Sequence, residues 1–126
     1  MILLDSDVLI EVERGRQNGL DWLRTIDGAI ALPAVVALKL LFGARNRAEL
    51  DRTRRFLAGF DVEELDGNDS SLVRELVGEH VLSSGLGLPD FMIAAQALNR
   101  KATLFTFNLK HCRSIPGLDA REPYQR

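Results

Sequence analysis

The chain begins Met1-Ile-Leu-Leu-Asp5-Ser-Asp7-Val-Leu-Ile10, a stretch in which three apolar residues run directly into two carboxylates. Ile2–Leu4 is short, apolar and suited to a central strand that is buried on both faces. Asp5 would end this strand, and a carboxylate placed there loses its hydration unless neighbouring groups compensate it. Ligands of open parallel sheets bind beyond the carboxyl ends of the strands, so we expect the chemistry of this protein at that edge.

Strands and helices alternate along the rest of the chain. Three further strands are predicted at Ala29–Leu32, Asp61–Leu65 and Thr103–Thr106, and the charges of the second favour a sheet edge. The helix that follows Pro33 is apolar nearly all round, so we expect it to be buried. The order predicts an α/β fold with a short parallel sheet covered by helices. The predicted helices are Ser6–Arg14, Asn18–Ile26, Pro33–Phe42, Asn46–Ala58, Leu72–Val81 and Asp90–Asn99.

Length and composition indicate an ordered protein with one domain over residues 1–126. The longest apolar run is too short to span a membrane, and the N-terminus lacks the features of a signal peptide, so a cytoplasmic location is expected. Cys112 is the only cysteine, which excludes an internal disulfide and a cysteine-based zinc site. We interpret it as a packing thiol. The net charge of −2 says little about partners.

Three oxygen-bearing side chains are expected to converge near the end of the first strand. Asp5 closes that strand, Asn108 follows the predicted strand at Thr103–Thr106, and Asp90 lies in the first turn of a helix. Carboxylate and amide oxygens suit a hard cation such as Mg²⁺ or Mn²⁺. Taken singly, Asp90 is better explained as a helix-terminal carboxylate and Asn108 as a turn residue.

Four segments, in this order, resemble the PIN-domain ribonucleases of the VapC toxin type. The first two are Leu3-Leu-Asp-Ser-Asp-Val-Leu-Ile10 and the Ala-x-x-Leu-x-x-Gly-Ala segment Ala37–Ala44. The others are Leu88-Pro-Asp-Phe-Met-Ile-Ala-Ala95, and Leu104–Asn108 followed by Ile115-Pro-Gly-Leu118. The resemblance implies a PIN-like α/β/α sandwich and a metal-dependent endonuclease that cleaves RNA, often a structured RNA such as transfer RNA. It also implies a homodimer, silenced by a VapB-type antitoxin whose apolar segment lies over the helices near the site.

The resemblance also assigns roles to particular positions. Asp5 matches the first acid of the family and Asp90 the later one, and these two would hold Mg²⁺ or Mn²⁺. Asn108 matches the last position of the site. Ser6 and Thr106 match small hydroxyl residues that orient the acids, and Asp7 takes a place usually held by Asn. In such sites the cation activates a water and offsets phosphate charge, so no side-chain nucleophile is needed.

Lys39 departs from the family pattern, which places a glutamate directly before Leu-x-x-Gly-Ala. One interpretation is a surface lysine whose stem packs while its ammonium reaches water. The other is that its ammonium points into the acid site, forms ion pairs with Asp5 and Asp90, and partly replaces the metal. We therefore hypothesise that the site of this chain is impaired.

Several other charged residues are candidates for weaker roles. The arginines between the second and third predicted strands could contact RNA phosphates, although a solvated helix face explains them as well. His80 and His111 lack the partners of a nucleophilic triad or a zinc site, so both are interpreted as structural. The candidate arginines are Arg45, Arg47, Arg52, Arg54 and Arg55.

Two other function classes stay open at this point. A phosphatase of the haloacid dehalogenase type also begins with an apolar strand and Asp-x-Asp, with Asp5 as nucleophile and Asp7 as acid/base. Its other usual motifs are not found here. A non-catalytic module that binds RNA or an antitoxin is the second alternative, and Lys39 supports it.

Overall fold

A computed structural model describes all of residues 1–126 and places five strands in one parallel sheet. The order across the sheet is β3-β2-β1-β4-β5, so the opening strand is central as predicted. The strands are β1 (Ile2–Leu4), β2 (Ile30–Pro33), β3 (Asp61–Glu63), β4 (Thr103–Phe105) and β5 (Ala120–Arg121). The helices are α1 (Ser6–Glu13), α2 (Gln17–Thr25), α3 (Ala34–Phe42), α4 (Arg47–Leu57), α5 (Gly67–Ser84), α6 (Leu88–Arg100) and α7 (Leu109–Cys112).

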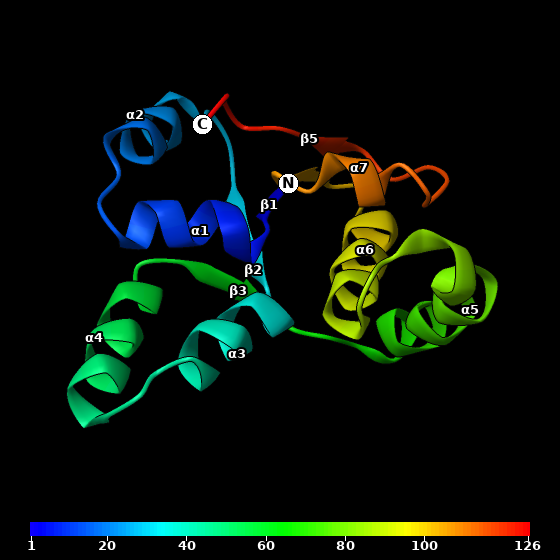
Figure 1. The fold of residues 1–126 in the computed structure, drawn as a ribbon, viewed down its shortest axis with the longest axis horizontal. Coiled ribbons are helices and arrows are strands. Elements are labelled where there is room, and N and C mark those ends of the chain that lie inside the picture. Colours follow the sequence, from blue (N-terminus) through cyan, green and yellow to red (C-terminus); the bar gives the residue numbers. More distant parts are fainter.

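Helices cover both faces of the sheet (Figure 1). α1, α2 and α4 lie to one side of it, α5, α6 and α7 lie to the other, and α3 continues directly from β2. The main core joins the sheet to α1, α3 and α6, and its fully buried members include Leu4, Leu32 and Leu104. A smaller cluster around Phe91 joins α5 to α6. The predicted α/β fold is confirmed.

The register of β1 and β4 explains why polar residues meet at one edge. Leu4 pairs with Phe105, so Asp5 and Thr106 follow neighbouring parallel strands at the same level. The backbone N–H of Asp5 donates to the carbonyl of Phe105 at 3.0 Å, which continues the pairing one residue beyond β1. The first residues after both strands are thereby fixed by sheet hydrogen bonds rather than by a free loop.

One expectation about burial was wrong. The inner face of α3 is buried, but Phe42 is 93% exposed, Leu38 is 57% exposed and Lys39 is exposed as well. The reason is geometric: α3 packs inward on β2, α1 and α6, and no element of this chain covers its outer face.

The sequence patterns also missed two short elements. α7 has four residues, and β5 has two, one of them a charged arginine, so neither carries a hydrophobic period. β5 is set by parallel pairing with β4, and α7 packs against β5. No helix of the protein is long and apolar enough to cross a membrane.

Candidate active site

Asp5 is the most enclosed carboxylate beyond the ends of the strands, at 7% exposure. One oxygen accepts hydrogen bonds from the backbone N–H of Ser6 at 2.7 Å and from the Ser6 hydroxyl at 3.4 Å. The other accepts from the Thr106 hydroxyl at 2.8 Å. Asp5 is also the N-cap of α1, where the helix N-terminus favours negative charge. These contacts compensate its lost hydration, and Ser6 and Thr106 orient the carboxylate.

Asp7 lies one residue into α1 beside Asp5, and it is only partly satisfied. One oxygen accepts from the backbone N–H of Phe107 at 3.1 Å, whereas the other is buried and has no hydrogen-bond partner. Burial, followed by the charge of Asp5, raises the pKa of Asp7 to about 6. This carboxylate is therefore the one most in need of a further partner at the site.

Asp90 and Asn108 complete the set of oxygen-bearing side chains. Asp90 is the third residue of α6, and its carboxylate accepts from the Gly87 N–H at 2.9 Å. Asp5 and Asp90 line one small apolar cavity with Cys112, and the pKa of Cys112 is raised to about 11 by burial and then by Asp5 and Asp90. The thiol stays protonated, as a packing residue should.

His111 contributes a contact that the sequence did not reveal. Its Nδ1 lies 2.8 Å from the Asn108 side-chain oxygen, and the Asn108 N–H donates to the Thr106 hydroxyl at 3.0 Å. Gly85, at a φ of +73°, passes so close that a Cβ there would lie 3.3 Å from the His111 ring. His111 therefore holds Asn108 in place, a role visible only after α7 brings the two together.

Lys39 reaches the site without forming the expected ion pairs. Its Nζ donates to the Ser6 hydroxyl at 3.1 Å, and no carboxylate oxygen lies within 4.0 Å of it. The expectation of direct pairing with Asp5 and Asp90 was wrong, because the Ser6 hydroxyl stands between the ammonium and Asp5. Lys39 is exposed, as expected of a surface lysine, and its ammonium reaches the site through Ser6 rather than through an ion pair.

The five arginines proposed as RNA contacts fall into two groups. Arg45 is paired with Glu49 at 2.7 Å, and Arg47 and Arg54 both lie near Asp51. Arg52 and Arg55 have no carboxylate partner.

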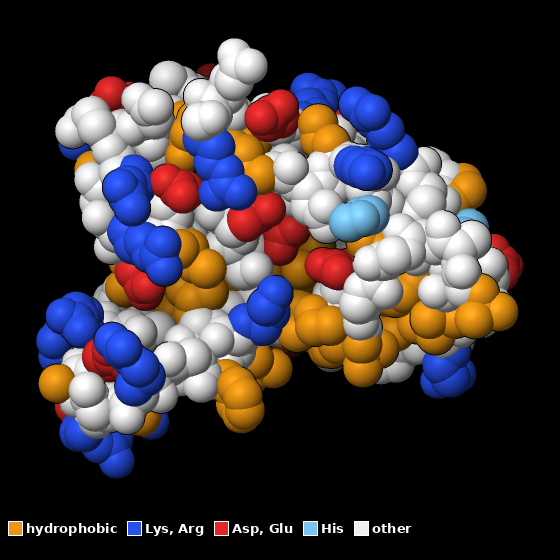
Figure 2. All heavy atoms as spheres, in the orientation of Figure 1, with side chains coloured by type: hydrophobic (Ala, Val, Ile, Leu, Met, Phe, Trp, Pro, Cys, Tyr) orange, Lys and Arg blue, Asp and Glu red, His pale blue; other side chains and the backbone are white.

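The acidic side chains of the site gather in a hollow at the middle of one face of the molecule, with basic side chains to its left (Figure 2).

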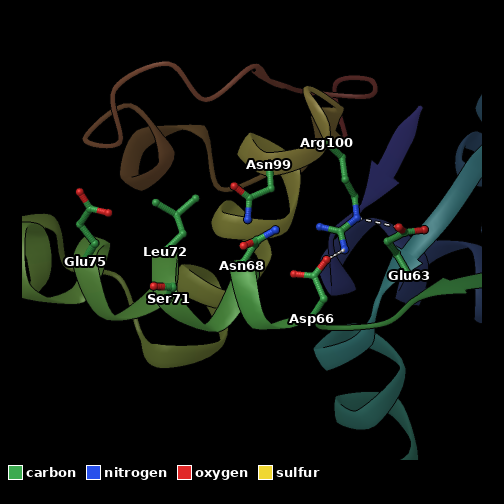
Figure 3. Close-up of a pocket in the computed structure, with 8 residues that line it drawn as sticks. All are labelled: Glu63, Asp66, Asn68, Ser71, Leu72, Glu75, Asn99 and Arg100. Carbon is green, nitrogen blue, oxygen red and sulfur yellow. Dashed lines mark hydrogen bonds and ion pairs between the residues drawn. The ribbon is translucent and has the colours of Figure 1, made fainter.

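A second acidic cluster lies where β3, α5 and α6 meet. Arg100 contacts Glu63 at 2.6 Å and Asp69 at 2.8 Å, with Asp66 at 4.0 Å, beside a hollow of about 570 Å³ (Figure 3). The hydrogen bonds of Arg100 hold the pKa of Asp69 well below its usual range. The sequence patterns did not reveal the role of Arg100, because its partners are more than thirty residues away.

The side chains of Asp5, Asp7, Asp90 and Asn108 form what we call the acid edge of the sheet. Their oxygen atoms are suitable ligands for a hydrated hard cation. The acid edge offers only oxygen ligands, it leaves one buried Asp7 oxygen without a partner, and no three acidic, histidine or cysteine side chains converge closely enough to enclose a metal ion. Mg²⁺ commonly keeps several waters and binds through one or two carboxylates. Asp5 and Asp90 supply that number.

Comparisons with known proteins agree with this arrangement. A model of the PIN domain matches residues 2–114. The chain is 36% identical over 117 residues to Ribonuclease VapC10 of Mycobacterium tuberculosis, covering 88% of this chain and 85% of that protein. It resembles a toxin–antitoxin complex from Klebsiella pneumoniae with a TM-score of 0.81 at 26% identity over 100% of both chains. VapBC2 from Rickettsia felis, bound to a promoter DNA fragment, shares the fold with a TM-score of 0.85 at 21% identity, over 97% and 98% of the two chains.

Proposed function

Because the chain belongs to the PIN-domain family, we propose that it is an endoribonuclease toxin of a toxin–antitoxin pair, acting on RNA in the cytoplasm. The observation that carries this proposal is the set of Asp5, Asp7, Asp90 and Asn108 at one edge of the sheet. Family membership also displaces the phosphatase alternative. Both oxygens of Asp5 are occupied by Ser6 and Thr106, which is unfavourable for a nucleophile.

The residues of the acid edge divide the work among them. Asp5 and Asp90 would hold a Mg²⁺ or Mn²⁺ ion, which would lower the pKa of a water and offset charge on the phosphodiester. Ser6 and Thr106 fix the Asp5 carboxylate, and His111 fixes the Asn108 amide. Asn108 then has its neutral amide group at a fixed position, where the amide can contact the substrate or the waters that hydrate the substrate.

Lys39 weakens this site in the present chain. The Ser6 hydroxyl lies between its ammonium and the Asp5 carboxylate, and the family carries a carboxylate at the position of Lys39. A positive charge there repels a divalent cation and takes away one acidic ligand. The cleavage step is therefore impaired relative to a chain with glutamate at this position.

The test is Mg²⁺-dependent cleavage of RNA by the wild type and by Lys39→Glu. We expect the variant to cleave at least about tenfold faster, since a removed repulsion of about 1.4 kcal/mol corresponds to that factor. Lys39→Ala, which removes the charge without adding a ligand, should lie between the two. Equal rates for all three would show that Lys39 does not disable the enzyme.

A non-catalytic RNA- or antitoxin-binding module is the alternative that Lys39 favours. It predicts that Lys39→Glu binds RNA or antitoxin without cleaving, at any Mg²⁺ concentration. Our proposal predicts cleavage products that disappear when EDTA is added.

A cognate VapB-type antitoxin and a second copy of the chain complete the proposed assembly. Apolar side chains gather along the lower edge of the face in Figure 2, over α3 and the far end of α5. We propose that a second copy covers this apolar edge, which explains why α3 is exposed on its outer side. Phe42→Glu should convert a dimer to a monomer in light scattering, whereas Arg74→Glu should not. On α3, the apolar side chains of this edge are Leu38 and Phe42, which line one open hollow with Leu41.

A further inference from the structure

A basic groove of about 890 Å³ opens onto Ser6 and runs between α1, α3 and α4. Four cationic side chains line it, Arg14, Lys39, Arg45 and Arg52, against two carboxylates. Glu49 is already paired with Arg45, so that pair contributes no net charge. Arg14, Lys39 and Arg52 have no carboxylate within 4.0 Å, which leaves the groove positive at the point where it meets the acid edge.

The groove is a regular feature of the helices that form it. Ser6, Ile10 and Arg14 follow one another at four-residue spacing along one face of α1 and its C-cap. On the other wall, Glu49, Arg52 and Phe56 recur at spacings of three and four residues on one face of α4, and Arg45 lies just before the N-cap of that helix. Because of this helical spacing, the cationic side chains of both walls face the same groove.

We propose that this basic groove binds the phosphate backbone of the RNA strand, through Arg14, Lys39 and Arg52, independently of a bound metal ion. The inference rests on the proposed function, since it makes the groove the path by which RNA enters the acid edge. Its Lys39 end lies beside Ser6, whose hydroxyl contacts Asp5. A strand along the groove thus arrives at the carboxylates with its charge already neutralised.

Lys39 gains a second role from this placement. Acid sites normally repel phosphates until a cation binds, because both carry negative charge. The ammonium of Lys39 supplies positive charge at that point without a metal ion. The same substitution that weakens cleavage therefore strengthens binding of the substrate in the metal-free protein.

The experiment is fluorescence anisotropy of a labelled single-stranded RNA of about 12 nucleotides, in EDTA, over a range of salt concentrations. Three phosphate contacts on a single strand predict that affinity falls by ~20-fold between about 50 and 200 mM salt. Arg14→Ala/Arg52→Ala should bind about tenfold more weakly near 0.1 M salt and lose most of that salt dependence. Lys39→Glu should weaken binding further in EDTA.

The matched control is Arg16→Ala/Arg74→Ala, which removes two exposed, unpaired arginines, at the start of α2 and on α5, outside the groove. If it weakens binding as much as the groove variant, attraction is diffuse and the proposal is overturned. A synthetic amphipathic helix rich in Glu and Leu tests the other kind of occupant. Loss of peptide binding with unchanged RNA binding in the groove variant would make this a protein-docking surface. Because no cleavage is measured, these outcomes stand apart from those that test the proposed function.

Discussion

Two clusters of acidic side chains lie in this protein, and they differ in whether a cation already satisfies them. Around Arg100, the carboxylates of Glu63 and Asp69 receive short, charge-assisted hydrogen bonds. At the acid edge, no arginine or lysine pairs directly with Asp5, Asp7 or Asp90, and Asp7 keeps a buried oxygen without any partner. The lesson is that a satisfied cluster stabilises the fold, whereas an unsatisfied one is available for chemistry.

In each cluster the pKa of one aspartate is shifted, and the two shifts run in opposite directions. Arg100 lowers the pKa of Asp69, while burial and the charge of Asp5 raise the pKa of Asp7 to about 6. Ionised Asp69 thus stabilises the folded state, and ionised Asp7 destabilises it. The hollow beside Arg100 is larger than the small apolar cavity that Asp5 and Asp90 line, although the carboxylates around Arg100 are already paired.

The largest expected effect on the free energy of unfolding comes from removing Arg100. Arg100→Ala leaves Asp69, which has no exposed surface, without its cation, and we expect a loss of about 3–5 kcal/mol in the free energy of unfolding near neutral pH. Urea denaturation measures this, and Arg74→Ala on the exposed side of α5 is the control, expected within about 0.5 kcal/mol of the wild type. A loss below about 1 kcal/mol would mean that the cluster is not structural.

Removing an acid from the other cluster should have the reverse profile. In the Lys39→Glu background, Asp90→Asn is expected to reduce Mg²⁺-dependent RNA cleavage by about 100-fold or more, because it removes one of the three carboxylates that would hold the cation in that background. Its free energy of unfolding should change by less than about 1 kcal/mol, since the amide oxygen can still accept from Gly87. Cleavage rates and urea titrations measure the two effects. Full cleavage activity in the variant would exclude Asp90 from the site.

The smallest expected effect concerns the pH dependence of stability. With its pKa raised to about 6, Asp7 binds more protons in the folded than in the unfolded state between about pH 4 and 6. The free energy of unfolding therefore falls as pH rises through that window. Asp7→Asn should remove this component and be more stable by roughly 1 kcal/mol near neutral pH.

Thermal or urea denaturation at several pH values checks this component. The Asp69 component runs the other way, because its lowered pKa contributes stability above about pH 4 that is lost on further acidification. An Asp7→Asn variant with the same pH profile as the wild type would contradict the assigned origin of the shift.

Local sequence signals predicted most of the fold and the positions of the acids. The apolar run before Asp5, the helix that begins near Asn46 and the edge position of β3 all follow from residues close in sequence. The hydrogen bonds that organise the site do not follow from residues close in sequence. Thr106 meets Asp5 across 101 residues and Lys39 meets Ser6 across 33, so both depend on how β1, β4 and α3 are placed.

The exposed face of α3 could not be predicted for a related reason. A helix that is apolar all round is buried only if something covers both sides, and the sequence does not say whether the cover belongs to the same chain. Arg14 was missed because it stands apart from the arginine-rich stretch, although its spacing from Ser6 and Ile10 contains the signal.

The most direct measurement of the central claim is Mn²⁺ binding, followed by electron paramagnetic resonance, in the wild type and in Lys39→Glu. If the acid edge is the cation site and Lys39 weakens it, Lys39→Glu should bind one equivalent of Mn²⁺ at least about tenfold more tightly, which corresponds to about 1.4 kcal/mol. Adding Asp90→Asn should abolish the gain. Equal Mn²⁺ affinity in the wild type and Lys39→Glu, or a gain that survives Asp90→Asn, would contradict the account.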